Sequence, residues 1–250
     1  MVRVIVQHGA WNRWRRVFRA TVANSQWLAQ RLRDDGINVS HVIHNGTPIK
    51  PPRPALREPP IIAFAGRLVP EKGVSTLLAA MVLVTKKIPP CRLLLAGEGP
   101  NLREVEDQID RMGLRSHVSM PGYLSPSQLA QYLQATWVQV VPSSYEDPFP
   151  NVVIEAMMRG TAVVATAIGG ATEMIRDGKT GFLAAPSDSS ALAEKLLRLL
   201  ENRAAAEQMG AAGRRVALAE FTEDRMVESF LRLYASLLGG PDREVVRTSV

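Results

Sequence analysis

Short apolar runs alternate with stretches of helical periodicity along most of this chain. The apolar runs predict buried strands at 61–66, 92–100, 117–123, 137–141, 162–170 and 181–185. The stretches between and after them predict helices at 74–87, 101–113, 126–135 and 151–158, a helix capped by Asp188, and helices at 203–219 and 223–238. Strands that alternate with helices indicate an α/β fold with a Rossmann-like parallel sheet covered by helices on both faces.

The first fifty residues predict a smaller unit. Strands are expected at 2–7 and 39–46, with a basic helix at 11–20 and a second helix at 25–36 between them. This part is too short to bury both faces of a sheet, so we expect the remnant of a larger domain. A proline-dense stretch then predicts a semi-rigid linker. The expected organisation is 1–50 (remnant domain), 51–60 (linker), 61–220 (main domain) and 221–250 (C-terminal helix and tail).

Composition limits the cellular setting. No apolar run approaches the ~20 residues of a membrane span, and the start MVRVIVQHGAW lacks the long apolar core of a signal peptide. The single cysteine, Cys91, precedes the apolar run LLLA, which favours a small buried side chain. We therefore expect a protein of a reducing compartment, the cytoplasm.

The net charge of +6 suits an anionic partner, and part of the surplus lies in WNRWRRVFRA at 11–20. A basic and aromatic helix of this kind can lie on anionic lipid headgroups, which would place the protein on the inner face of the membrane. In the alternative, its arginines are solvated and its aromatic side chains contact a neighbouring domain. The sequence favours neither over the other.

Two glycine-containing loops follow predicted strands and suit phosphate chemistry. GRLVPEKG at 66–73 places Arg67 and Lys72 five residues apart, and the two cations can neutralise one diphosphate. LAGEGP at 95–100 offers free N–H groups ahead of a helix. In the alternative, the first loop carries unrelated solvated charges, but its place at the carboxyl end of a strand favours the ligand.

Several other chemistries lack their motifs. Neither GxGxxG nor GxxxxGK[ST] occurs, which leaves little support for dinucleotide or ATP binding. The four histidines and the lone cysteine show no metal-ligand spacing, and there is no GxSxG elbow of a hydrolase. The basic cluster has no recognised nucleic-acid module around it, so we expect no nucleic-acid partner.

These segments together resemble a known family. GRLVPEKG, LAGEGP, WVQVVPS and YEDPFPNVVIEAMMRGTAVVAT, followed by GG, E and DGKTGFL, are similar to the C-terminal, donor-binding half of retaining GT-B glycosyltransferases, glycosyltransferase family 4 above all. The similarity runs from about Ala23 to Asn202 in the family's order. It implies two Rossmann-like domains facing across a cleft, a nucleotide-sugar donor and no metal or other cofactor.

The resemblance also implies roles for single residues. Arg67 and Lys72 would bind the donor's diphosphate and stabilise the charge that develops on the leaving group. Glu155 would accept hydrogen bonds from the ribose, and Tyr123 is a weaker candidate for the base pocket. Backbone groups of the two glycine loops and of the following loop would approach the donor; these are Gly66, Gly97, Glu98, Gly99, Phe149, Asn151 and Val152.

One position departs from the family pattern, which spaces two glutamates with seven residues between them. Counting back from Glu155 leads to Asp147, whereas Glu146 leaves eight residues between. Either Asp147 takes the sugar-facing role with a shorter side chain, or the loop bulges so that Glu146 serves. The helix register favours Asp147. His8, which ends the first predicted strand, resembles a cleft histidine near the donor sugar; the alternative is a histidine that only caps that strand.

The leading hypothesis is thus a retaining glycosyltransferase with a glycan, lipid or small-molecule acceptor. Full-length relatives carry a complete first domain, whereas here only its end is expected. The second hypothesis is therefore a truncated or split-chain module that binds a nucleotide sugar without transferase activity of its own, with a separate chain supplying the first domain. A sugar-nucleotide epimerase is a weaker third, because its acid and base residues would lie in that first domain.

Overall fold

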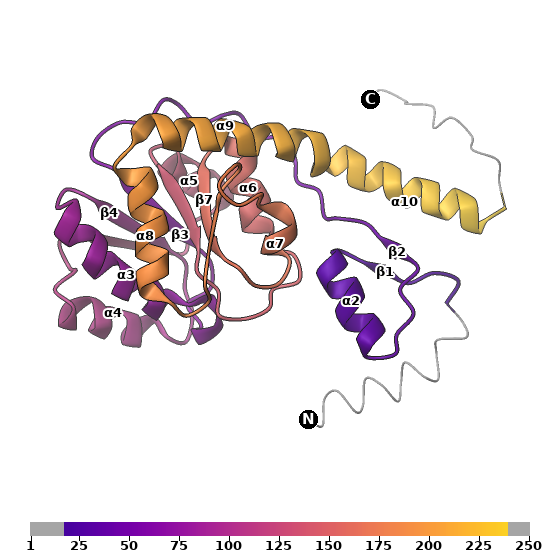
Figure 1. Ribbon diagram of the computed structural model, residues 1–250, viewed down its shortest axis with the longest axis horizontal. Helices are drawn as coiled ribbons and strands as arrows, with labels where there is room; N and C mark the ends of the chain where they lie inside the picture. Colours follow the sequence, from indigo (N-terminus) through magenta and orange to yellow (C-terminus); the bar gives the residue numbers. More distant parts are fainter. Residues whose placement is uncertain (1–17, 240–250) are drawn as a thin grey trace.

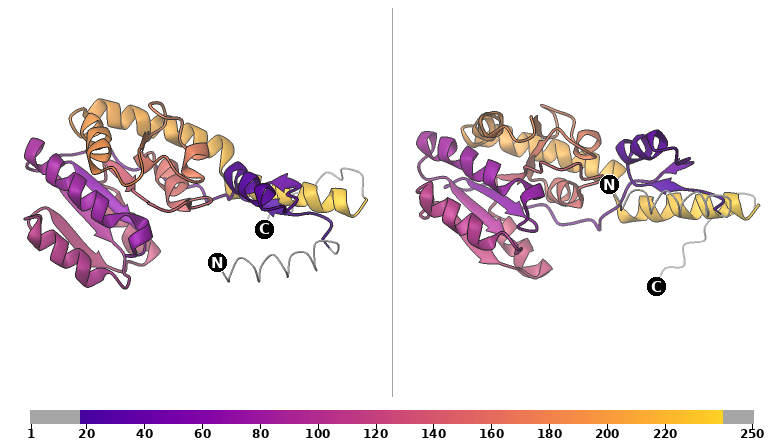
Figure 2. Two further views of the ribbon diagram at one scale, coloured as in Figure 1. Left: turned by 60° about the horizontal axis from the view of Figure 1, so that its bottom comes forward. Right: turned by 90° about the horizontal axis from the view of Figure 1, so that it is seen from below.

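The computed structural model describes residues 18–239, which form two parts. Residues 18–46 form a small N-terminal lobe, and residues 61–220 form a unit around a six-stranded sheet. The last helix, α10 (Glu223–Leu237), leaves the six-stranded unit and runs beside the lobe (Figures 1 and 2). The chain therefore returns at its end to the part from which it started.

The sheet of the larger unit is wholly parallel. Its strands are β3 (Ile61–Ala65), β4 (Arg92–Ala96), β5 (Val118–Gly122), β6 (Val138–Val141), β7 (Ala162–Thr166) and β8 (Phe182–Ala184). They lie in the order β5-β4-β3-β6-β7-β8, which confirms the Rossmann-like prediction. The direction of winding reverses between β3 and β6. In such sheets ligands bind at the carboxyl ends of the strands at this reversal.

Helices cover both faces of the sheet, as the alternating pattern predicted. The helices are α3 (Val74–Lys87), α4 (Leu102–Arg111), α5 (Pro126–Leu133), α6 (Asn151–Arg159), α7 (Ala171–Met174), α8 (Ser189–Leu200) and α9 (Arg203–Glu220), with a short 3₁₀ turn η1 (Pro70–Lys72) before α3. The side chains of α3, α4 and α8 share one apolar cluster with the sheet. Those of α5 contact β3 and β4 on the other face, and those of α6 and α7 contact β6 and β7.

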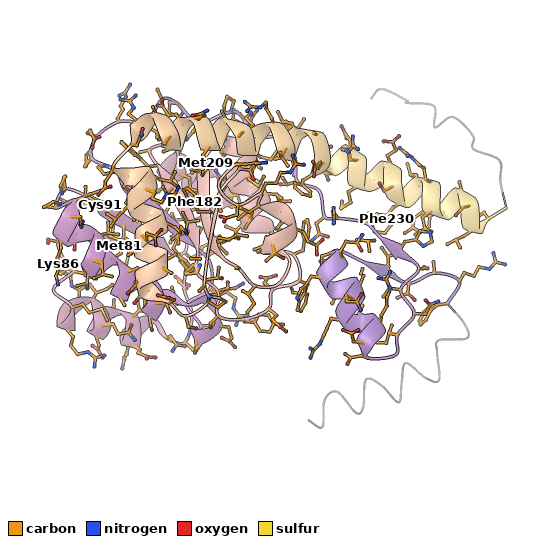
Figure 3. The ribbon with its side chains drawn as sticks, in the orientation of Figure 1. Met81, Lys86, Cys91, Phe182, Met209 and Phe230 are labelled. Carbon is orange, nitrogen blue, oxygen red and sulfur yellow. The ribbon has the colours of Figure 1, made fainter. Side chains whose placement is uncertain are left out.

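The core lies mainly between α3, α8 and the sheet. Met81, Phe182 and Met209 belong to this cluster and come from three different elements (Figure 3). Cys91 is fully buried in the same cluster, as expected for a small apolar side chain. Because both faces of the sheet are covered, its strands are almost continuously apolar, which is why they could be recognised in the sequence.

Local capping sets several helix ends. Ser125 and Gln128 form a capping box at the start of α5, and the Asp188 carboxylate accepts from Ala191 N–H at the start of α8. Gly113, in the left-handed conformation, follows the end of α4, a position where glycine commonly ends a helix. The sequence did not predict the four-residue helix α7, which is too short to show a helical period.

The proline-rich stretch 51–60 forms no helix or strand but is held closely against the six-stranded unit. Arg53 donates its backbone N–H to Arg159 O at 2.8 Å, and Leu56 is buried. The indole N–H of Trp137 donates to Arg57 O at 2.9 Å. The segment thus behaves as part of the domain wall and not as a free spacer.

The N-terminal lobe contains β1 (Val22–Ala23), α2 (Gln26–Asp34) and β2 (His41–Val42). The two strands pair in parallel over two residues each, so the strand predicted at 39–46 is much shorter than expected. A strand lengthens only where a neighbour pairs with it, and this is not visible in the sequence. Gly46 and Thr47 pair instead with α10: Gly46 N–H contacts Met226 Sδ, and Thr47 O accepts from Glu223 N–H.

Several predictions fall outside the described residues. They are the strand at 2–7 with His8, and residues 11–17 of the basic and aromatic stretch. Arg19, from the end of that stretch, lies within the structure and donates Nη1 to Leu237 O at 2.7 Å on α10. Within residues 18–239, no helix has the length and apolar character that crossing a membrane requires.

Candidate functional site

Loops that follow β3 and β6 interlock through their backbones at the reversal point of the sheet. Gly73, at φ +69°, lies so close to Pro142 that a Cβ on it would come within 1.9 Å of the Pro142 carbonyl oxygen. Ser144 N–H donates to Glu71 O at 3.0 Å. Only glycine satisfies both the left-handed conformation and the contact. The loop carrying Lys72 is therefore fixed against the loop carrying Asp147.

The glycines of LAGEGP have a similar structural role. A Cβ on Gly97 would lie 1.9 Å from Gly66 O, and one on Gly99 would lie 2.2 Å from Leu68 O. Leu68 N–H also donates to Glu98 O at 2.8 Å. The sequence suggested that these glycines let a ligand approach the backbone. In the structure the group that approaches Gly97 and Gly99 is the neighbouring loop.

The loop after β7 completes this arrangement. Gly170 N–H donates to Asp147 O at 2.9 Å, and a Cβ on Gly169 would lie 2.3 Å from the same oxygen. The side chain of Thr166, at the end of β7, donates to Ser143 O at 2.6 Å. The backbone of Asp147 is thus held by the loop after β7, and that of Ser143 by the end of β7 itself.

The structure pairs Lys72 with Asp147. The ammonium Nζ lies 2.9 Å from Asp147 Oδ2, and the side chains are only 31% and 25% exposed. Glu146, the alternative acid, is exposed and makes no ion pair with any residue between 18 and 239. Arg67 is likewise exposed, with no ion-pair partner in the described part of the chain. The rim therefore offers one paired cation and one unpaired cation.

The N-terminus of α6 opens on the same rim. The helix begins after Pro150, which gives no side-chain cap, and its first turn has no acidic residue. The backbone N–H groups of Asn151 and Val152 have no acceptor among residues 18–239, so they are available to an anion. The N–H of Phe149, which the sequence also assigned to the donor, is directed at Asp147 Oδ1 at 3.3 Å.

Glu155 and Tyr123 lie farther along the same edge and line a common cavity of about 540 Å³ between α5 and α6. Tyr123 is 70% exposed, and its N–H donates to the carboxylate of Glu98 at 3.3 Å. Glu155 is half-buried on the first turns of α6. The predicted site residues thus fall into two neighbouring groups, one around Lys72 and Asp147 and one around the cavity.

Several residues of this cavity were not predicted from the sequence. Arg159 lines it one turn after Glu155, Arg53 lines it from the proline-rich stretch, and Lys50 lines it from just before that stretch. Burial lowers the pKa of Arg159, while the nearby Glu155 carboxylate opposes that shift. One signal in the sequence could have pointed to Arg159: Gln139 is the polar residue in the otherwise apolar strand WVQVV. A buried polar side chain needs a hydrogen-bond partner, and Arg159 Nη2 donates to Gln139 Oε1 at 2.9 Å. In residues 18–239, no His, Cys, Asp and Glu side chains gather in a group able to hold a metal ion.

Comparison with known proteins places this arrangement in context. The model of the family described as Glycosyl transferases group 1 matches residues 47–216. A curated relative, 2-deoxystreptamine N-acetyl-D-glucosaminyltransferase of Niallia circulans, is 28% identical over 70% of this chain and 45% of its own length. The chain spans between 40% and 45% of the length of the first curated relatives it matches.

Solved structures share the fold. Sucrose-phosphate synthase from Thermosynechococcus elongatus superposes with a TM-score of 0.79 at 32% identity, over 87% of this chain and 58% of that one. A TarM variant from S. aureus, in complex with Fondaparinux, alpha-GlcNAc-glycerol and UDP, superposes with a TM-score of 0.78 at 26% identity, over 86% of this chain and 43% of that one. These proteins confirm the predicted GT-B type of α/β fold.

Proposed function

Because the chain belongs to the family of glycosyl transferases group 1, we propose that it takes part in transferring a sugar from a nucleotide-diphosphate donor to an acceptor. The proposed site is the rim at the carboxyl ends of β3 and β6. One observation carries the proposal. Lys72, Arg67 and the uncapped N-terminus of α6 all follow the carboxyl ends of these two strands, in a fold whose ligands bind at this reversal point.

The proposed chemistry is electrostatic. When the bond between the sugar and the diphosphate breaks, negative charge develops on the departing phosphate. Arg67 and Lys72 would stabilise that charge, together with the N–H groups of Asn151 and Val152. Since Lys72 already lies 2.9 Å from Asp147, the carboxylate holds the ammonium at the rim before the donor arrives. The cation is then positioned in advance of the reaction.

The finer assignment follows glycosyltransferase family 4. We propose retention of configuration without a protein nucleophile, in which the departing phosphate takes the proton of the acceptor hydroxyl. Asp147 would face the sugar, because its carboxylate is fixed next to Lys72 whereas that of Glu146 is exposed. His8 would approach the same sugar from the first predicted strand, which lies outside the described residues. No metal is proposed for this reaction.

Glu155 is proposed to hold the ribose. A carboxylate has two oxygens that can each accept a hydrogen bond, which matches a pair of vicinal hydroxyls. Its position on α6, between the helix N-terminus and the α5–α6 cavity, suits a nucleoside whose diphosphate lies at the rim. The TarM structure in complex with UDP supports a uridine or similar nucleotide as the partner.

The proposal is tested by titrating a uridine or guanosine diphosphate sugar into the chain and measuring heat. Arg67→Ala, Lys72→Ala and Glu155→Ala should each weaken binding roughly tenfold to a hundredfold, because each removes a charged hydrogen-bonding partner. Arg115→Ala is the matched control, since Arg115 is exposed and pairs with Asp110 at the opposite edge of the sheet. Unchanged affinity in all three variants would refute the site.

A second candidate is a nucleotide-sugar-binding module without transfer activity of its own. The observation that favours it is that the chain spans less than half the length of the first curated relatives it matches. A turnover assay separates the two candidates, with donor alone to detect hydrolysis and with crude lipid or glycan acceptors to detect transfer. Turnover by the purified chain supports the transferase. Donor binding without turnover, restored when a separate first domain is added, supports the module.

A further inference from the structure

The chain leaves the N-terminal lobe through residues 44–47, and this segment is fixed against the junction of α9 and α10. Thr47 N–H donates to Phe221 O at 3.0 Å, and Thr47 O accepts from Glu223 N–H at 3.2 Å. The first two residues of the segment contact residues 147–151, the donor loop, which ends at the first residue of α6. The end of the lobe and the loop of the candidate site therefore lie side by side.

His44 contacts the donor loop through its ring. It stacks on the Phe149 ring, with the ring centroids 5.3 Å apart and the planes 17° from parallel. Both rings also contact the Phe221 ring, at 5.7 Å and 5.9 Å. Phe149 is only 4% exposed, so its ring can move only if its packed neighbours move with it. The lobe thus supplies one of the rings that hold the donor loop.

The position of Phe149 affects the geometry of the candidate site. Its N–H lies 3.3 Å from Asp147 Oδ1, and Asp147 Oδ2 lies 2.9 Å from Lys72 Nζ. Phe149 also stands between two prolines, which restrict the backbone around it. A shift of its ring would therefore carry its N–H away from the carboxylate. A chain of contacts runs in this way from the lobe to the paired cation of the rim.

Asn45 contacts the other end of the donor loop. Its Nδ2 donates to Asn151 Oδ1 at 3.1 Å, although 106 positions separate the two residues in the sequence. Asn151 is the first residue of α6, whose backbone N–H groups are proposed to meet the diphosphate. Two consecutive residues of the lobe therefore contact the donor loop at two places that the proposed chemistry uses.

We infer that His44 and Asn45 are positioning residues for the donor loop: His44 holds the end that carries Asp147, and Asn45 holds the start of α6. The inference rests on the proposed function, in which these two ends face the sugar and the diphosphate. Both residues act through their neighbours, His44 through Phe149 and Asn45 through Asn151.

The two contacts should matter most for the diphosphate and the sugar. Glu155, which is proposed to hold the ribose, lies farther along α6 and is separate from the donor loop. Loosening the donor loop should therefore weaken the binding of a nucleotide-diphosphate sugar strongly and that of a nucleoside monophosphate only slightly. A merely structural role for His44 would weaken both ligands alike or neither of them.

Calorimetry on the whole chain measures both affinities, with UDP-glucose and UMP or with GDP-mannose and GMP, according to which nucleotide sugar the unaltered chain binds. His44→Ala should weaken the nucleotide sugar about tenfold and the monophosphate less than about threefold. His44→Phe keeps a flat ring on Phe149 and should restore the affinity for the nucleotide sugar to within about threefold. His41→Ala is the matched control, because His41 is an exposed histidine of β2 that hydrogen-bonds to Ser40. It should change neither affinity.

Amide exchange measures the donor loop without a ligand. In His44→Ala, exchange should accelerate in residues 149–153 and stay unchanged in β3 and β4. Should His44→Ala fail to fold, Asn45→Ala takes its place, since it removes a partly exposed amide. It should weaken the nucleotide sugar about fivefold and leave the monophosphate unchanged.

Three results would overturn the inference: equal weakening of both ligands, unchanged affinity for the nucleotide sugar, or a loss in His44→Ala that His44→Phe does not restore. Each of them leaves the proposed function intact as long as Lys72→Ala still weakens the nucleotide sugar. Absence of nucleotide-sugar binding by the unaltered chain would instead reject the proposed function, and this inference with it.

Discussion

The six-stranded unit and the N-terminal lobe both contain parallel β–α–β structure, but they differ in how completely helices cover their sheets. In the unit, helices cover both faces of the sheet, and residues such as Ile62 and Leu93 are fully buried. In the described residues of the lobe, two strands of two residues each pair beside one helix, and Ala23, Ala29 and Val39 form the buried cluster. Parallel strands are stable mainly when both faces are covered. The lobe therefore depends on contacts with the unit.

Those contacts are few and specific. The Glu173 carboxylate, on α7 of the unit, accepts from the backbone N–H groups of Gln26 and Trp27 at the start of α2. It also lies 3.4 Å from His44 Nε2, and the His44 ring stacks on Phe149 at 5.3 Å. One acid thus caps a helix of the lobe and lies beside the loop of the candidate site. The comparison indicates that the unit is stabilised by its core and the lobe by its attachment.

The largest expected loss of stability comes from a substitution at the rim of the six-stranded unit. Gly73→Ala places a Cβ within 1.9 Å of Pro142 O at φ +69°, so we expect the free energy of unfolding to fall by more than about 3 kcal/mol. Gly36→Ala, in the lobe, has a similar φ of +76° but nothing within 4 Å, and should cost only about 1–2 kcal/mol. Urea unfolding of both variants measures the difference. Equal costs would contradict the tight contact.

A smaller effect is expected at the attachment of the lobe. Glu173→Ala removes the acceptor of two N–H groups at the positive end of α2, which is worth about 1–2 kcal/mol locally. Amide exchange should accelerate roughly tenfold in residues 26–34 and stay unchanged in β3 and β4. Glu194→Ala, on the exposed side of α8, is the control. Acceleration throughout the sheet would show that the two parts unfold together.

The smallest expected effect concerns Cys91, whose thiol should not react with labelling reagents. Burial raises the pKa of the Cys91 thiol to about 12, so thiol reagents should not label it while the six-stranded unit stays folded. Because burial disfavours the thiolate, the folded state loses stability relative to the unfolded state as the pH rises above the ordinary pKa of 9.0 towards 12, and this effect is absent below 9.0. Labelling kinetics near neutral pH check the prediction. In Glu173→Ala, labelling should remain slow although the lobe is loosened.

Local patterns predicted the elements of the unit well. The helix predicted at 74–87 has those bounds in the structure, and Asp188 is an N-cap as expected. Periodicity and capping depend on residues within a few positions of one another, so one sequence suffices to find them. The length of the strand predicted at 39–46 was wrong, because pairing depends on a partner elsewhere in the chain.

The amino-acid sequence by itself thus determined the order of strands and helices, the parallel α/β class and the loops that carry Arg67, Lys72, Asp147 and Glu155. Only the tertiary structure decided that Lys72 contacts Asp147, that the rim glycines contact neighbouring loops, and that Arg159, which lines a cavity together with residues 50–54, donates to Gln139. The physical reason is distance along the chain. Periodicity depends on residues that are close in the sequence. Ion pairs, close backbone contacts and side-chain hydrogen bonds such as that between Arg159 and Gln139 form between residues that only the folded sheet brings together.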